Sequence, residues 1–150
     1  MNKTLMAAGL AVVLGACNSY KKSDGVDTSA VNPFFTEYTT PFGVPPFEQI
    51  KVEHYKPAFL KGMEEQTAEV EAIVNNPDKA TFENTIVALD RSGELLMKVA
   101  YAYSGQLIVN THDEFQALEH DLSSCLSKHS DEIRLKPSLF VRVQPYSYNL

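Results

Sequence analysis

From Val52 onward, apolar residues recur at steps of three and four, the spacing that puts them on one side of an α-helix. Pro57 lies near the start of the first helical segment, where a missing N–H matters least, and Asn75-Asn76-Pro77 ends it. No segment alternates as a strand would. The predicted inner face of this first helix is Phe59, Met63, Val70, Ile73 and Val74, with Glu64, Glu65, Glu69 and Glu71 mostly outside it.

Two further helices follow. The second is predicted to start after Thr81 as N-cap and to continue without a break along a regular apolar face: Phe82, Ile86, Leu89, Gly93, Leu96, Ala100, Tyr103 and Leu107. The third begins at Thr111-His112-Asp113-Glu114, a capping-box pattern in which threonine and glutamate satisfy each other's backbone donors. Its face is Phe115, Leu118, Leu122, Cys125, His129 and Ile133.

After Pro137 the pattern weakens. Ser138 to Val143 opens a fourth helix, but Pro145 would stand in its interior at a cost of about 3 kcal/mol or more. We therefore expect this helix not to develop, and residues 144–150 to form an aberrant tail. Three amphipathic helices joined by short breaks predict an all-α fold, an antiparallel helical bundle spanning residues 52–143.

The segment before the helices, residues 32–51, combines prolines with four phenylalanines. Such an aromatic content is unusual for a disordered linker. We interpret the segment as an extended strap whose Phe rings pack onto the helices. The alternative is a polyproline segment offered to the groove of a partner. Residues 17–31 are polar and are predicted to be a flexible tether.

Residues 1–16 have the organisation of a signal peptide: Lys3 in a short polar start, an apolar stretch, and small residues before the cleavage point. Leu14-Gly15-Ala16-Cys17 resembles the bacterial lipobox, which predicts acylation of Cys17 and a chain anchored by lipid in the bacterial envelope, facing the periplasm. The alternative is an ordinary signal peptide that a cysteine happens to follow. With Cys17 acylated, Cys125 would have no partner within the chain.

The charge balance excludes one class of partner. The formal net charge is −6 and becomes more negative when the signal peptide, with Lys3, is removed. A nucleic-acid-binding protein needs clustered Lys and Arg to neutralise phosphates, and no basic stripe is present.

No catalytic or metal-binding residue is predicted. The histidines (His54, His112, His120, His129) contain no pair one helical turn apart, so a His-Glu-x-x-His zinc motif is absent. Asp121, Cys125 and His129 share a helix face, with Glu132 a turn further, but positions eight apart are separated by about 12 Å along the axis. We expect them to pack in the core or an interface. Neither a Gly-x-Ser-x-Gly elbow nor a glycine-rich phosphate loop occurs.

Three segments resemble the N-terminal region of the thimet-oligopeptidase-like zinc peptidases, most closely the bacterial peptidyl-dipeptidases, also called dipeptidyl carboxypeptidases. They are Phe47-Glu-Gln-Ile-Lys-Val-Glu-His-Tyr-Lys-Pro-Ala-Phe59, Thr81-Phe-Glu-Asn-Thr-Ile-Val-Ala-Leu-Asp90 and Ser138-Leu-Phe-Val-Arg-Val143. Asn32-Pro-Phe-Phe35 and Pro41-Phe-Gly-Val-Pro-Pro-Phe47 fit secreted members.

The resemblance implies that the chain is an N-terminal fragment of a larger helical peptidase, containing part of the lobe that walls a peptide channel. In the full-length family, zinc held by a His-Glu-x-x-His helix and a later glutamate activates the water that releases dipeptides from oligopeptide C-termini. No such residue lies in this chain, so the fragment is expected to bind no zinc and to be inactive alone. The alternative function is a small envelope lipoprotein acting as a binding or adaptor module.

Overall fold

The structure, a computed structural model, describes residues 32–109 and 113–147. These residues contain helices and no strand, which confirms the all-α prediction. None of the described helices is both long and apolar enough to cross a membrane. The helices are α1 (Val52–Val74), α2 (Ala88–Arg91), α3 (Glu94–Val109), α4 (Asp113–Arg134) and α5 (Pro137–Ser147), with the 3-10 turns η2 (Pro33–Phe35) and η3 (Pro41–Gly43) and the π-helical turn η4 (Phe82–Val87).

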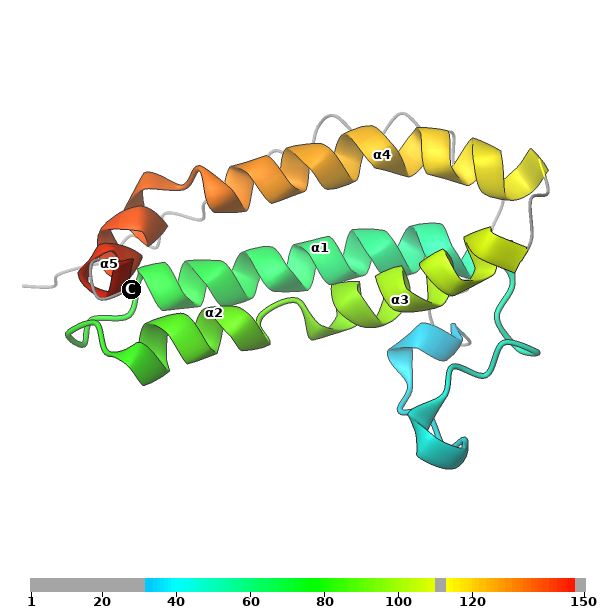
Figure 1. Ribbon diagram of the computed structural model, residues 1–150, viewed down its shortest axis with the longest axis horizontal. Coiled ribbons are helices and arrows are strands. Elements are labelled where there is room, and N and C mark those ends of the chain that lie inside the picture. The colour runs from blue at the N-terminus through cyan, green and yellow to red at the C-terminus, as the bar shows by residue number, and fades with distance from the viewer. Residues whose placement is uncertain (1–31, 110–112, 148–150) are drawn as a thin grey trace, which may run out of the picture.

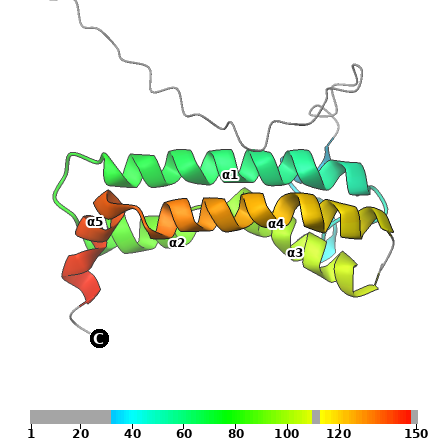
Figure 2. The ribbon, with the colours of Figure 1, turned by 90° about the horizontal axis from the view of Figure 1, so that it is seen from above.

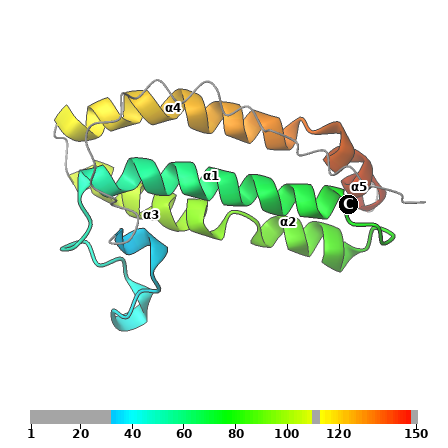
Figure 3. The same cartoon turned by 180° about the vertical axis from the view of Figure 1, so that it is seen from behind.

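The long helices run side by side and consecutive ones are antiparallel (Figure 1). The α2–α3 pair returns along α1, and α4 then runs back in the direction of α1 (Figures 1 and 3). α5 turns away at the end of α4 and packs beside the C-terminal end of α1 (Figure 2). The antiparallel bundle predicted from the sequence is therefore the observed architecture.

The start of α1 is fixed by a histidine and an asparagine. The backbone N–H of Lys51 donates to Nδ1 of His54 at 3.0 Å, which satisfies one of the donors that a helix N-terminus leaves open. Nδ2 of Asn32 donates to the carbonyl of His54 at 2.9 Å, and Oδ1 of Asn32 accepts from Phe34 N–H. Asn32 and His54 are both buried, so this pair holds the strap against α1.

The predicted inner faces of the first and third helices are confirmed. Phe59, Met63, Val70 and Ile73 of α1 are buried. On α4, Phe115, Leu118, Leu122 and His129 are buried, while Cys125 and Ile133 are half-buried. Of the capping pattern expected before α4, Thr111 and His112 lie outside the described residues.

The second predicted helix is interrupted at Ser92-Gly93, which separates α2 from α3. Gly93 has a φ of +79°, a conformation that strongly favours glycine. Its N–H donates to Oε2 of Glu69 at 2.7 Å. The prediction of one continuous helix is therefore wrong, because a carboxylate of α1 satisfies the backbone group that the break frees. Thr81 does cap the segment as predicted, by accepting from Asn84 N–H at 3.1 Å.

Within α3 the predicted face is largely confirmed. Tyr103 is buried, and Leu96, Ala100 and Leu107 are half-buried against the same core, with Val99 and Ala102 buried beside them. The predicted face included Tyr103 but neither Val99 nor Ala102. Phe82, the first residue of that predicted face, is 58% exposed.

The fourth helix develops, contrary to the sequence prediction. α5 includes Pro145, which stands near its C-terminal end, where only the bond to the carbonyl four residues earlier is lost. Tyr146 Oη donates to the carbonyl of Ala80 at 3.0 Å, and the rings of Tyr146 and Phe82 are 6.1 Å apart. Residues 144–147 thus continue the helix and contact the start of η4, and they are not a separate tail.

Two groups of buried side chains form the core. The larger is aromatic at its centre, where Tyr55 lies 5.1 Å from Phe34 and 5.4 Å from Tyr103 between ring centroids. The smaller, at the opposite end of α1, consists of Val70, Ile73 and Leu139 with half-buried neighbours from α2 and α5. We refer to them as the aromatic core and the aliphatic core.

The strap, residues 32–51, behaves only in part as predicted. Phe34 is fully buried in the aromatic core. Lys98 of α3 donates to the carbonyls of Phe34 and Thr36 at 3.0 and 2.7 Å, which fastens the strap to the bundle. Phe35 and Phe47 are partly exposed, however, and Phe42 is completely exposed with a φ of +61°. The expectation that the Phe rings pack onto the helices is correct for Phe34 alone.

Candidate functional site

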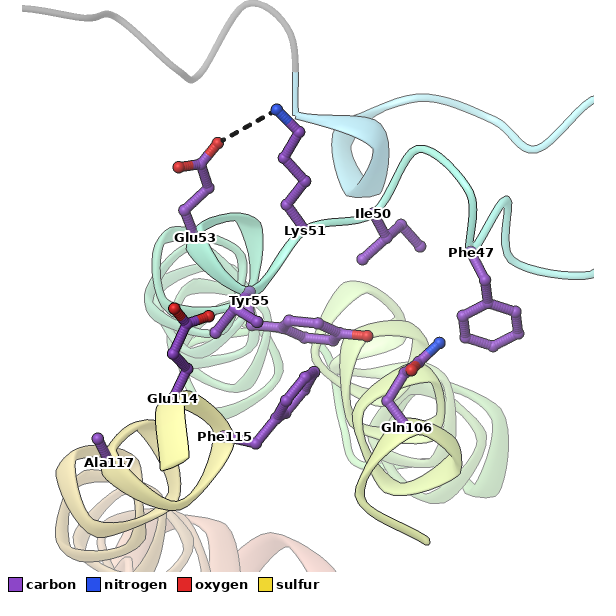
Figure 4. A pocket seen from close by; sticks show the side chains of 10 residues that line it. Phe47, Ile50, Lys51, Glu53, Tyr55, Gln106, Glu114, Phe115 and Ala117 are labelled. Atoms are coloured by element: carbon purple, nitrogen blue, oxygen red, sulfur yellow. Dashed lines mark ion pairs between the residues drawn. The ribbon is translucent and has the colours of Figure 1, made fainter. Parts of the chain in front are cut away.

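An open hollow of about 880 Å³ lies where the strap, α1, α3 and α4 meet (Figure 4). The rings of Tyr55 and Phe115 form part of its wall, and Phe47 and Ile50 of the strap add apolar surface. The polar residues that line it are Lys51, Glu53, Gln106 and Glu114. The hollow therefore offers apolar surface beside charged groups, a combination suited to holding a side chain of an extended peptide.

The charged groups near the hollow face water. Lys51 and Glu53 form an ion pair at 3.9 Å in which both side chains are largely exposed, and Glu114 is also exposed (Figure 4). Exposed pairs of this kind contribute little to stability, at most about 1 kcal/mol. Their side chains are thus available to contact a charged ligand.

Tyr55 contributes apolar ring surface to the hollow, because its buried hydroxyl donates its one hydrogen to the carbonyl of Ala102. Burial of its hydroxyl, with a smaller contribution from Tyr38 and Tyr103, raises the pKa of Tyr55 to about 12. The hydroxyl therefore stays protonated near neutral pH, and it lies 3.5 Å from the carbonyl of Ala102. It is not a base for proton abstraction, and no serine, cysteine or histidine lines the hollow.

A second open hollow, of about 850 Å³, lies between the strap and α3. Lys98 lines it, with Nζ 3.9 Å from the centre of the Tyr38 ring. Burial lowers the pKa of Lys98, while Glu94 and Glu37 act in the opposite direction. Because its ammonium group also donates to two strap carbonyls, we assign Lys98 a structural role.

The residues with ligand-like spacing on α4 are each engaged elsewhere. Asp121 is exposed and pairs with Lys56 of α1 at 2.7 Å. His129 is buried, and its Nε2 lies 2.8 Å from Oε1 of Gln66. Glu132 pairs with Lys128 at 3.7 Å. Within residues 32–109 and 113–147, no three His, Cys, Asp or Glu side chains gather in a way that could hold a metal ion, so these residues do not fit a zinc site.

The predictions for the two cysteines are tested to different extents. Cys125 is half-buried and disulfide-bonded, whereas acylation of Cys17 was expected to leave it without a partner within the chain. A disulfide between the two cysteines of one chain and acylation of Cys17 exclude each other. Cys17 lies outside the described residues, and its acylation stays a prediction.

Sequence reasoning missed the polar residues that join distant segments. Gln66 and Glu69 of α1 bind the Ser92-Gly93 break, and Arg142 of α5 binds the loop before η4. The Glu-His pair at the start of α1 was a signal for helix capping, since the third residue of a helix commonly bonds back to the N-cap. The other partners are separated by 24 or more positions, and local patterns carry no information about them.

Comparison with known proteins places this geometry in a family context. No family model matches the chain. It is 41% identical over 115 residues to the dipeptidyl carboxypeptidase of Escherichia coli, and 39% identical over 114 residues to the dipeptidyl carboxypeptidase of Salmonella typhimurium. These matches cover 77% and 76% of this chain. The chain spans only 17% of the length of either relative. The resemblance to dipeptidyl carboxypeptidases inferred from the sequence is thereby confirmed.

Proposed function

We propose that the chain forms part of the helical channel wall of a zinc peptidase similar to the dipeptidyl carboxypeptidases, and that the complete enzyme releases dipeptides from oligopeptide C-termini. The observation that carries the proposal is the 41% identity to such a relative over most of this chain. The all-α fold is consistent with the helical lobe that the resemblance implies.

The hollow beside Tyr55 and Phe115 supplies the contact with peptide in this proposal. Its apolar wall accommodates a hydrophobic side chain of the peptide. Lys51 and Glu53 at its edge interact with charged residues of the peptide. In this proposal the chain binds and orients the peptide substrate, while the groups that break the peptide bond belong to the remainder of the enzyme.

Zinc in the complete enzyme would polarise the attacking water. The described residues of this chain do not fit that role, because none of their acidic, histidine or cysteine side chains converge in a metal-binding group. The metal ligands are therefore proposed to lie in the part of the enzyme that this chain does not span.

The exposed surface favours a peptidase part over a small lipoprotein module. A module evolved to stand alone should have mostly polar outer faces. The described residues instead expose large apolar side chains on several helices, among them Phe82, Met97, Tyr101, Ile108, Leu135, Phe140 and Val141. These residues lie on η4, on α3, in the turn before α5 and on α5 itself.

We also propose that the chain is exported and anchored to the bacterial envelope by lipid on Cys17. The support is the Leu14-Gly15-Ala16-Cys17 motif after an apolar stretch. The membrane contact in this proposal comes from acyl chains, and stable attachment needs two or more of them.

A chimera tests the peptidase proposal. The matched segment of the Escherichia coli dipeptidyl carboxypeptidase is replaced by the corresponding residues of this chain, and dipeptide release from an N-blocked tetrapeptide is measured by mass spectrometry with zinc present. We expect the chimera to release dipeptides and this chain alone to release none. A chimera that is folded and zinc-loaded yet inactive, beside an active parent enzyme, would contradict the proposal.

A further inference from the structure

α3 is apolar almost all the way round. Between Glu94 and Val109 its only charged residues are Glu94 itself and Lys98. A helix with this composition is normally buried on all sides, since an exposed helix carries a polar face. In this structure one side packs against the aromatic core, with Val99, Ala102 and Tyr103 buried and Leu96, Ala100 and Leu107 half-buried.

The opposite side of α3 is open to water. Met97, Tyr101 and Ile108 are 47%, 69% and 84% exposed. Ser104 and Gly105 lie between them and are also exposed. We call these five residues the outer face of α3. None of the five is charged, and the exposed Glu94, one turn before Met97 on the same side, borders the face at the start of α3.

Two details make the outer face suitable for close packing. Gly105 has no side chain, and a Cβ atom built on it would meet nothing within 4 Å, so another helix can approach the backbone of α3 at this position. The hydroxyl of Ser104 donates to the carbonyls of Ala100 and Tyr101 at 2.9 and 3.1 Å, within its own helix. Because that hydroxyl is already satisfied, covering Ser104 with an apolar group leaves no donor unpaired.

We propose that the outer face of α3 is the docking surface for an apolar helix from the remaining part of the peptidase polypeptide. This inference rests on the proposed function. Any 115-residue stretch of a 150-residue chain includes residues 36–115, so α3 lies inside the matched region wherever the match begins. In the relative that region is 17% of a longer polypeptide. The proposal assigns the covering helix to the remaining part. The lack of charge on the face requires a partner of the same apolar character.

The test compares one double substitution in two settings. Tyr101→Glu with Ile108→Glu adds two carboxylates to the outer face. In this chain alone both positions are exposed, so the melting temperature should change by less than about 2 °C. In the chimera described above the carboxylates would be buried, and the melting temperature should fall by roughly 5 °C or more. Gln116→Glu with Ser127→Glu, at exposed positions of α4, is the matched control and should be neutral in both settings.

Three outcomes would overturn the inference. One is an equal effect of the outer-face substitution in the chain alone and in the chimera. Another is an isolated chain that sediments as a dimer and becomes monomeric on Tyr101→Glu with Ile108→Glu, since the occupant would then be a second copy. The third uses the native Escherichia coli enzyme, so it does not depend on folding of the chimera. Glutamates are placed at the two aligned positions of that enzyme, and an unchanged melting temperature would overturn the inference.

The two proposals fail separately. Dipeptide release by the chimera tests the peptidase function, whereas the difference in melting temperature tests docking. An active chimera that tolerates the outer-face glutamates would refute docking alone. An inactive but folded chimera that they destabilise would refute the function alone.

Discussion

Gly62 of α1 lies against the backbone of Leu96 in α3, so closely that a Cβ atom on Gly62 would stand 2.8 Å from Leu96 Cα and 2.9 Å from Leu96 N. Backbone atoms cannot turn aside as a flexible side chain can. The separation of α1 and α3 is therefore set by the absence of a side chain at position 62, next to the buried Phe59 and Met63.

Gly62→Ala should lower the free energy of unfolding by roughly 1–3 kcal/mol, because the added methyl group forces the two helices apart in a packed core. Gly105→Ala is the matched control on α3, where nothing lies within 4 Å. That change should be neutral or stabilise the chain by up to about 1 kcal/mol, since alanine favours the helix. Urea unfolding followed by circular dichroism measures both, and equal effects of the two changes would contradict the close approach.

Arg142→Ala should destabilise the chain by roughly 2 kcal/mol, as expected for loss of charged hydrogen bonds that are partly buried. The guanidinium donates to the carbonyls of Asn76 and Asp78 at 2.8 and 3.2 Å, which ties α5 to the loop between α1 and η4. Arg134→Ala, an exposed arginine at the end of α4, serves as control and should have little effect. If urea unfolding shows no difference between these variants, α5 is not held in this way.

His129 should make the chain less stable at mildly acidic pH. Burial is the main cause that lowers the pKa of His129 in the folded state, and Glu132 acts weakly in the opposite direction. The imidazole of His129 therefore binds a proton more readily in the unfolded chain than in the folded one. The contribution of neutral His129 to the free energy of unfolding is complete above about pH 6.5 and is lost as the pH falls below that value. Unfolding midpoints at pH 7.5 and 5.5 should differ more for the parent chain than for His129→Gln. His120→Gln, at an exposed position of α4, should retain the difference; a parent chain that is more stable at pH 5.5 than at 7.5 would refute this assignment.

Cys17→Ser should abolish incorporation of labelled fatty acid and release the protein from membranes, while Cys125→Ser should keep both properties. Acylation turns the sulfur of Cys17 into a thioether, so it excludes a disulfide between the two cysteines of one chain. Intact-mass measurement without reductant separates the two states. An unlabelled parent chain lighter by two hydrogens would contradict the lipid anchor.

The helices that the sequence predicts correctly are those whose faces depend on local spacing. Phe59, Met63 and Val70 on α1, and Phe115, Leu118 and Leu122 on α4, follow the helical period and are buried. The break in the second helix was not predictable in this way, because it depends on Glu69, which accepts from a backbone 24 residues later. The helical end of the chain depends in the same way on Tyr146, whose partner Ala80 is 66 residues earlier.

The candidate site was less predictable than the fold. Its hollow is lined by the strap and by three helices, so none of the sequence motifs contains more than a part of it. The sequence assigned His54 no catalytic or metal-binding role, and it did not reveal a structural one. In the structure Nδ1 of His54 caps α1, and the carbonyl of His54 accepts from the amide of Asn32.

The Ser92-Gly93 break also has a dynamic consequence. Among the described helices, only α1 and α4 extend continuously from the aromatic core to the aliphatic core. The third helical segment of the bundle is divided by the break into α2 and α3. Segments joined by few covalent and packing links open as separate cooperative units in native-state hydrogen exchange. Amides of α2 and α5 should therefore exchange through a local opening of lower free energy than those of Tyr55 or Val99, and the chain should unravel from its aliphatic end first.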